Sequence, residues 1–326
     1  MKLRKGDKMK NLNIKRCTVF FMLLSIVILG VGKTTYAKET TTSQEITAES
    51  YGKKAINIMD KNGLYKNTKE WKEAKKEVFE DLKKVKTYEE TYPIIEKAIK
   101  VAGGKHSFFI KKPLVDETQE LNAIEYPTTE YKDNILTLKL PSYVGTKEQG
   151  QKYADTLANK IITSKNLKGV VVDLRENGGG DMGPMLAGLA PLLPDGNLMY
   201  FESNRGTSPV KLTKGLISGG GMPTRAKVGH IKVKTKVAIL TGENTASSAE
   251  ATFISFMGLD NVKSFGKPTA GYASANTVIP LADGAEMVLT IARDKARTGE
   301  VFAEDPIVPD MVTDNPLEEA IKWINE

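Results

Sequence analysis

The run from Val170 to Leu174 is the feature that most constrains the fold of this chain. Its letters are Val-Val-Val-Asp-Leu, and the apolar residues do not alternate with polar ones. Such a run is typical of a strand that is covered on both faces. Three glycines follow at 178–180, and the apolar stretch 184–193 predicts a helix directly after them. A buried strand, a glycine turn and a helix in this order indicate an α/β sheet.

The same order of elements recurs before and after this unit. A strand at 135–140 precedes a helix that a capping box at Thr146 and Gln149 opens. Further along, a strand at 237–240 leads through a polar turn into a helix at 249–257. Repeated alternation of strands and helices predicts an α/β domain that fills most of the chain.

The region 38–105 has a different pattern, which predicts a flexible segment followed by a small helical unit. Residues 38–48 are rich in Thr, Glu and Lys, as in flexible segments. A second helix is expected from a capping box at Thr87 and Glu90 to the glycines at 103–104. The first helix is indicated by apolar residues at steps of three and four: Trp71, Ala74, Val78, Leu82 and Val85.

The first 37 residues have the organisation of a secretory signal peptide. A basic segment precedes the apolar run 19–31, and a small-residue site ends at Ala37. The apolar run is shorter than the roughly 20 residues that a spanning helix needs, so an uncleaved anchor is the less favoured alternative. The segment 1–37 holds eight Lys or Arg and one Asp, which accounts for the whole formal charge of +7. The exported chain is therefore near neutral, and its charge gives no reason to expect nucleic acid as a partner.

Cysteine and histidine usage argues against a metal centre. The single cysteine, Cys17, lies in the leader, so the exported chain can form no disulfide and no cysteine-ligated metal site. His106 and His230 are the only histidines, and we expect neither a metal nor a cofactor. The segment 266–269 reads Gly-Lys-Pro-Thr, but it lacks the earlier glycine of a phosphate-binding loop, so nucleotide binding is rejected.

Two strand-to-helix junctions are candidates for chemistry, because unpaired backbone amides at such junctions can bind developing negative charge. The first junction, 173–180, ends in three glycines that let the backbone approach a substrate closely. The second, 245–250, places Ser247 at the start of a helix. Taken singly, the first could be a plain flexible loop and the second a simple N-cap.

Together, the junctions resemble the tail-specific or C-terminal processing peptidases of family S41, including their tricorn-like branch. The resemblance covers roughly residues 50–326. It implies a ClpP/crotonase-like core of ββα units at 106–326, behind the helical unit. Only about 27 residues separate His106 from the strand near 135, so a PDZ domain cannot lie between them. Four motifs carry the resemblance in order: 173–179, Ser247 with Glu250, 266–271 and 307–310.

The resemblance also implies catalytic roles. Ser247 matches the family's nucleophile. Members that use a Ser/Lys dyad carry the lysine where this chain has Tyr272, and a phenol with a pKa of about 10 is a poor base at neutral pH. The branch without that lysine uses a histidine, whose place His106 occupies, although Gly104 replaces the aspartate of its motif. An imidazole suits the role of general base. His230 is interpreted as structural.

The third catalytic residue and the oxyanion site follow from the same resemblance. Glu304 is the expected partner of the histidine, with the adjacent Asp305 as the alternative. Backbone amides of Gly178, Gly179 and Ser248 are expected to bind the oxyanion.

The expected function is that of an exported serine-type endopeptidase or C-terminal processing peptidase, with a protein or peptide as substrate. A non-catalytic peptide- or apolar-ligand-binding protein and an acyl-CoA enzyme of the same fold are the rivals. The glycine-rich loop 218–222 is either a mobile cover of the cleft or an ordinary surface loop.

Overall fold

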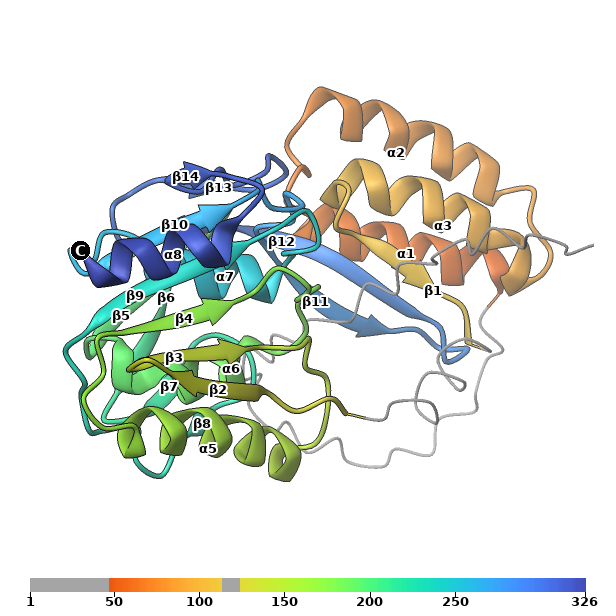
Figure 1. The fold of residues 1–326 in the computed structure, drawn as a ribbon. Coiled ribbons are helices and arrows are strands. Elements are labelled where there is room, and N and C mark those ends of the chain that lie inside the picture. Colours follow the sequence, from red (N-terminus) through yellow and green to blue (C-terminus); the bar gives the residue numbers. More distant parts are fainter. Residues whose placement is uncertain (1–46, 113–123) are drawn as a thin grey trace, which may run out of the picture.

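The computed structural model describes residues 47–112 and 124–326, so the predicted leader 1–37 lies outside the described residues. A group of three helices lies at one end of the molecule, beside two sheets (Figure 1). The helices are α1 (Ala48–Asn62), α2 (Lys69–Leu82) and α3 (Tyr88–Gly103). The predictions of α2 and α3 are confirmed, and Thr87 caps α3 by accepting a hydrogen bond from the Glu90 N–H. Helix α1 was not predicted.

A six-stranded sheet forms the centre of the α/β part, with the strand order β14-β10-β9-β4-β3-β2. Strands β3, β4, β9, β10 and β14 run parallel, while β2 pairs antiparallel with β3. The predicted α/β architecture is confirmed. The strands are β2 (Thr128–Lys132), β3 (Ile135–Lys139), β4 (Gly169–Asp173), β9 (Lys236–Thr241), β10 (Val262–Gly266) and β14 (Met311–Val312).

Helices cover both faces of this sheet. Val171 packs into one core with α8, whereas its neighbours Val170 and Val172 pack into the core on the opposite face with α5, α6 and α7. This two-sided burial is why the run around Val171 is apolar at successive positions. The helices are α5 (Lys147–Thr163), α6 (Met182–Leu189), continued by a 3₁₀ turn at Ala190–Leu192, α7 (Ser248–Ile254) and α8 (Pro316–Asn325).

The second sheet has eight strands and is antiparallel. Its longest strand, β12, pairs with β1, β5, β11 and β13 and extends from the α/β part to the helices (Figure 1). The turn at 281–285 joins β11 to β12. The strands are β1 (Phe108–Ile110), β5 (Gly196–Ser203), β6 (Gly206–Thr213), β7 (Leu216–Ser218), β8 (Thr224–Arg225), β11 (Ser274–Pro280), β12 (Glu286–Ala296) and β13 (Val301–Phe302).

The helical unit is fixed to the tip of the β11–β12 hairpin. The hydroxyls of Tyr51 and Tyr92 donate hydrogen bonds to the two carboxylate oxygens of Asp283, at 2.9 and 2.6 Å. Met287 and Leu289 of β12 share the apolar core of the three helices. The helices therefore pack on the strand that also borders the candidate site described below.

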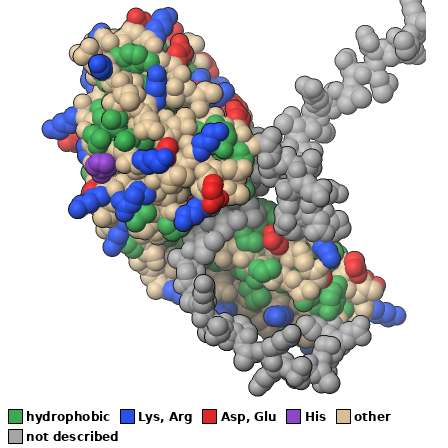
Figure 2. Space-filling view, turned by 90° about the horizontal axis from the view of Figure 1, so that it is seen from below, with side chains coloured by type: hydrophobic (Ala, Val, Ile, Leu, Met, Phe, Trp, Pro, Cys, Tyr) green, Lys and Arg blue, Asp and Glu red, His purple; other side chains and the backbone are tan. Residues whose placement is uncertain are grey.

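The surface is mixed in character. On the face shown in Figure 2, lysine and arginine side chains stand singly or in small groups, with acidic and apolar side chains between them. A continuous basic stripe of the kind that follows a nucleic-acid backbone is not seen on this face of the described residues. Within 47–112 and 124–326, no helix has the length and apolar content needed to cross a membrane.

Candidate active site

Ser247 lies at the junction of β9 and α7 in a conformation that side chains rarely adopt. Its φ is 56° and its ψ is −118°, and only 3% of the residue is exposed. A non-glycine residue in such a region costs free energy that the surrounding structure must offset, and these residues concentrate at active sites. A serine that only capped α7 would not need this conformation.

A buried carboxylate holds the serine turn in place. Glu250 is fully buried, and its Oε2 accepts hydrogen bonds from the backbone N–H groups of Ser247 and Tyr272, both at 2.8 Å. Its Oε1 accepts from the Gly271 N–H at 3.0 Å and from the Thr269 hydroxyl. Burial raises the pKa of Glu250 above its usual range, although these donors act in the opposite direction. Glu250 thus joins the serine turn to the segment 269–272.

The glycine junction packs directly against the serine turn. The Ala246 N–H donates to the carbonyl of Asn177 at 3.0 Å, and the Ser248 hydroxyl donates to the carbonyl of Gly180. Gly179 has a φ of 105°, and a Cβ there would lie 2.8 Å from the Cβ of Ser247. Only glycine fits this position. The structure therefore brings together Gly178, Gly179, Ser247 and Ser248, which the sequence placed in two separate motifs.

The two glycine amides differ in what they bind. The Gly179 N–H donates to the buried side-chain oxygen of Asn177 at 2.9 Å. The Gly178 N–H donates to the Ser142 hydroxyl at 2.8 Å, and Gly178 is half-buried. An oxyanion-hole donor lies at this distance from the oxygen that it stabilises. The Ser142 oxygen thus occupies a place that a substrate oxygen could take.

His106 is held by neutral groups. Its Nδ1 lies 2.9 Å from the Oγ of Ser274, and its carbonyl accepts a hydrogen bond from the Asn276 side chain at 3.2 Å. The next residue, Ser107, donates to the Thr290 hydroxyl at 2.9 Å, and that hydroxyl donates to the Asn276 side chain at 2.7 Å. All five residues are buried. This network fixes the histidine loop on strands β11 and β12.

The segment 271–274 connects the histidine to the serine turn. The Tyr272 backbone is bound to Glu250, as Ser247 is, and the Tyr272 ring lies edge-on to the His106 ring, with 5.3 Å between centroids. Two residues later, Ser274 contacts Nδ1 of His106. The two predicted catalytic residues, far apart in sequence, thus belong to one connected structure.

The environment of His106 favours the neutral imidazole. Burial lowers the pKa of His106 to about 3, and the positive charges of Lys100 and Lys105 act in the same direction. A hydrogen bond with the Ser274 backbone opposes them. A neutral ring is the form that can accept a proton from a serine. Burial thus shifts the pKa of His106 below the ordinary histidine value near 6.5.

Glu304 does not take the place next to Nδ1 that the sequence predicted. Its Oε1 accepts the backbone N–H of Lys105 at 2.7 Å, whereas Nδ1 of His106 faces Ser274. A Cβ on Gly104 would lie 1.9 Å from this Oε1, so the missing side chain at 104 makes room for the carboxylate. Glu304 thus stabilises the histidine loop through the backbone N–H of Lys105.

Comparisons with known proteins identify the family of this chain. The model of peptidase family S41 matches residues 134–313. The nisin-resistance protein of Lactococcus lactis subsp. lactis is 40% identical over 277 residues, which are 85% of this chain and 86% of that protein. The chain belongs to peptidase family S41. It is therefore a serine-type peptidase.

Solved structures share this fold over most of the chain. A lipoprotein from Streptococcus agalactiae matches with a TM-score of 0.76 and 32% identity, covering 88% of this chain and 99% of that one. The photosystem II D1 C-terminal processing protease matches with a TM-score of 0.60 and 16% identity, covering 88% and 98%. The second likeness shows the fold alone. The predicted family is confirmed.

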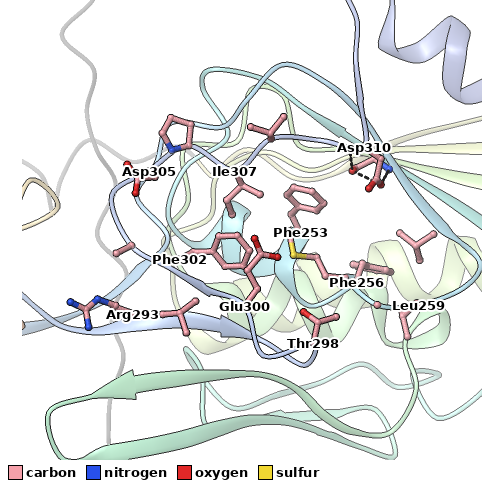
Figure 3. Close-up of a pocket in the computed structure, with 18 residues that line it drawn as sticks. Phe253, Phe256, Leu259, Arg293, Thr298, Glu300, Phe302, Asp305, Ile307 and Asp310 are labelled. Carbon is pink, nitrogen blue, oxygen red and sulfur yellow. Dashed lines mark hydrogen bonds between the residues drawn. The ribbon is translucent and has the colours of Figure 1, made fainter.

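The structure also places Lys267, from the motif 266–271, and Asp305, the residue after Glu304. Lys267 is half-exposed and pairs with Asp314 at 3.1 Å on the surface. Asp305, the alternative third residue, lines a pocket of about 890 Å³ together with Phe253, Phe256 and Ile307 (Figure 3). Neither Ser247 nor His106 lines this pocket, so it is separate from the candidate catalytic residues.

The glycine-rich loop of this S41 chain is anchored near the oxyanion junction. Asp181, the N-cap of α6, accepts hydrogen bonds from the backbone N–H groups of Gly183 at 2.8 Å and of Met222 at 2.9 and 3.0 Å. Burial raises the pKa of Asp181 above its usual range. The loop 218–222 is thus bound to the start of α6 through Asp181, the residue that follows Gly180. Among the residues that the structure describes, no group of three His, Cys, Asp or Glu could hold a metal ion.

Proposed function

We propose that this S41 peptidase hydrolyses peptide bonds through an acyl-enzyme on Ser247, with His106 as general base. The observation that carries the proposal is the backbone conformation of Ser247, held at a φ of 56° by the buried Glu250 carboxylate. A strained serine between a strand and a helix presents its hydroxyl, as in other serine hydrolases. The bridge from Glu250 through Tyr272 and Ser274 to His106 supports the choice of base.

In this mechanism, the Ser247 Oγ attacks the carbonyl carbon of the scissile peptide bond, and its proton passes to Nε2 of His106. The C–N bond then breaks, and the leaving amine takes that proton. Water attacks the resulting ester, His106 again accepts and returns a proton, and the product carboxylate leaves. The serine hydroxyl is restored, and every atom and proton is accounted for without a cofactor.

Backbone amides of the two junctions are proposed to stabilise the oxyanion. Gly178 is preferred over Gly179, because the Gly179 N–H is already bound to the buried Asn177 side chain. The substrate oxygen would replace the Ser142 hydroxyl at Gly178, and the Ser248 N–H at the start of α7 would be the second donor. This arrangement needs no metal.

The proposed substrate is a peptide or protein outside the cytoplasm. The leader at 1–37 supports export, and the similar proteins are named as peptidases, as a lipoprotein and as a nisin-resistance protein. Nisin is therefore the first substrate to test, with a peptide that carries a free C-terminus as the second.

A fluorophosphonate probe tests the proposal, because it reacts only with an activated serine. We expect labelling of the wild-type protein at Ser247 by peptide mass mapping, none in Ser247→Ala, and retained labelling in the matched control Ser248→Ala. A non-catalytic binding protein would stay unlabelled. Labelling at Ser248 instead would mean that the nucleophile was assigned one residue too early.

A further inference from the structure

We infer that the Ser274 hydroxyl is the positioning group of His106: it holds the imidazole with Nδ1 towards β11 and leaves Nε2 for Ser247. This inference rests on the proposed function, because it concerns the orientation of the proposed base. It assigns to a neutral side chain the role that the sequence argument gave to Glu304.

The geometry around β11 supports this role. The Oγ of Ser274 lies 2.9 Å from Nδ1, and both residues are buried, with exposures of 6% and 2%. The register of β11 against β12 shifts between Ala275 and Asn276, which lies between the two side chains that contact His106. Such irregularities re-aim side chains and are common beside active sites. The strand is thus shaped to present Ser274 to the ring and Asn276 to the histidine backbone.

The contact with Ser274 bears on the tautomer of His106. A hydroxyl can either donate to Nδ1 or accept from it, so Ser274 Oγ alone permits both tautomers. In the inferred arrangement, the Nδ1–H of His106 donates to the Ser274 Oγ, and Nε2 keeps the lone pair that general-base catalysis needs.

The neighbouring charged groups have other contacts. Glu304 accepts the Lys105 N–H, and the Lys105 ammonium donates to the Ala270 carbonyl at 3.3 Å. Lys100 donates to the Lys105 carbonyl at 3.0 Å, and Tyr272 presents its ring edge-on. The histidine thus lies between two lysines and a neutral hydroxyl. This environment orients the ring without stabilising its positive charge.

The chain offers a direct measurement, because it contains only two histidines. The ring-nitrogen chemical shifts of His106 and His230 can be separated with a His230→Gln variant and followed by NMR from pH 4 to 8. We expect His106 in the wild-type protein to carry its proton on Nδ1 and to stay neutral down to about pH 5. The Ser274→Ala variant should give a mixture of tautomers and a kcat that is about 10 to 100 times lower, with KM little changed.

Two variants separate positioning from packing. Ser274→Thr keeps a hydroxyl and should retain the Nδ1–H tautomer and most of kcat. Ser274→Asp places a carboxylate beside the ring and should make His106 titrate about two pH units higher than in the wild-type protein, because an opposite charge favours the imidazolium. Ser255→Ala is the control, since this buried hydroxyl bonds only within its own helix segment, to Ala251, and should leave the His106 shifts unchanged.

The inference and the proposed function fail differently. A wild-type tautomer and an undiminished kcat in Ser274→Ala would overturn the role of Ser274, while inactive Ser247→Ala and His106→Ala variants would leave the proposed function standing. Should Ser274→Ala not fold, an Nε2–H tautomer in the wild-type protein or in Ser274→Thr would reject the inference. Full activity of Ser247→Ala would reject the proposed function itself.

Discussion

Ser247 and His106 are held by different kinds of groups. A buried carboxylate, Glu250, gathers four hydrogen-bond donors and keeps Ser247 in a strained backbone conformation. His106 itself is held by hydroxyl and amide groups, with Ser274 facing the ring, while the Glu304 carboxylate binds the backbone N–H of the neighbouring Lys105. The difference shows where each residue needs support. The nucleophile needs a fixed backbone, whereas the base needs a fixed ring in its neutral form.

Removing the nucleophile gives the largest expected effect on activity. Ser247→Ala should lower kcat for peptide hydrolysis at least about a thousandfold, because the remaining groups can only bind and polarise the substrate. Single-turnover hydrolysis of a fluorogenic peptide measures this loss.

Ser247→Gly tests the strain at the same position. It should be equally inactive but raise the free energy of unfolding by about 1 kcal/mol, since glycine adopts a positive φ without steric cost. An unchanged or lower stability in urea titration would mean that the serine turn stores no strain, and the contrast with the histidine loop would weaken.

Glu250→Gln tests the charged side of the comparison. Its amide group would point a donor at backbone N–H groups, and we expect the free energy of unfolding to fall by about 3 kcal/mol with loss of activity. Thermal and urea denaturation measure the change. Asn276→Asp is the matched variant beside His106, because it introduces a charge among neutral groups. It should also lower the free energy of unfolding. A stable, active Glu250→Gln variant would show that the Glu250 carboxylate is not needed to hold the serine turn.

The low pKa of His106 predicts a particular pH dependence. In the unfolded chain, histidine binds a proton below about pH 6.5, whereas the folded protein resists protonation until about pH 3. Stability from this group is therefore complete above pH 6.5 and falls by about 1.4 kcal/mol for each pH unit between 6.5 and 3. Comparing the pH dependence of unfolding in wild type and His106→Gln isolates this effect, because other titrating groups cancel.

The same pKa should appear in the kinetics. The acid limb of kcat/KM is expected below pH 5, since this parameter reports ionisations of the free enzyme. An acid limb between pH 6 and 7 would show that the histidine is more hydrated than its burial indicates.

The anchors of the helical unit should have smaller effects. Tyr51→Phe and Tyr92→Phe each remove one hydrogen bond to Asp283 and should each lower the free energy of unfolding by about 1 kcal/mol. The double variant should be less than additive, because both hydroxyls share one carboxylate. Independent melting of the helices by circular dichroism would instead indicate a separate folding unit.

Lys267→Ala should have the smallest effect. Its ammonium pairs with Asp314 at the surface, where water and salt screen the attraction between the two charges. Peptidase activity should remain within about twofold of the wild-type value. Loss of hydrolysis, together with an active His106→Ala variant, would restore a serine-lysine mechanism.

Much of the fold could be predicted because its signals are local. The apolar strand around Val171 and the capping boxes at Thr87 and Thr146 act within a few residues, and the structure has the corresponding strand and helices. Helix α1 was missed, although Tyr51, Ala55, Ile56 and Met59 recur at helical spacing. Its neighbours 38–48 had suggested flexibility, and this obscured the pattern.

The partners of the candidate site were harder to predict, because they depend on contacts between distant segments. Ser274 lies 168 residues after His106, and an isolated serine in a strand has no motif that marks it. Glu250 lies within a family motif, but the motif does not show that its carboxylate binds the segment 269–272. That contact depends on the path of a segment about 20 residues further along the chain. The choice of Glu304 came from its place in the motif, whereas the gap left by Gly104 aims its carboxylate at a backbone amide.

The carboxylate of Asp283 also bears on how this protein can be modified. Exposed hairpin turns are usual places for inserting a tag, a fluorescent label or new chain termini. The Asp283-Gly284 turn looks suitable in the sequence, yet its Asp283 carboxylate binds the hydroxyls of Tyr51 and Tyr92. An insertion there would loosen three helices at once and disturb the far end of the hairpin that carries Ser274. The exposed turn at 298–300 between β12 and β13 is the safer place for a label that must leave the enzyme intact.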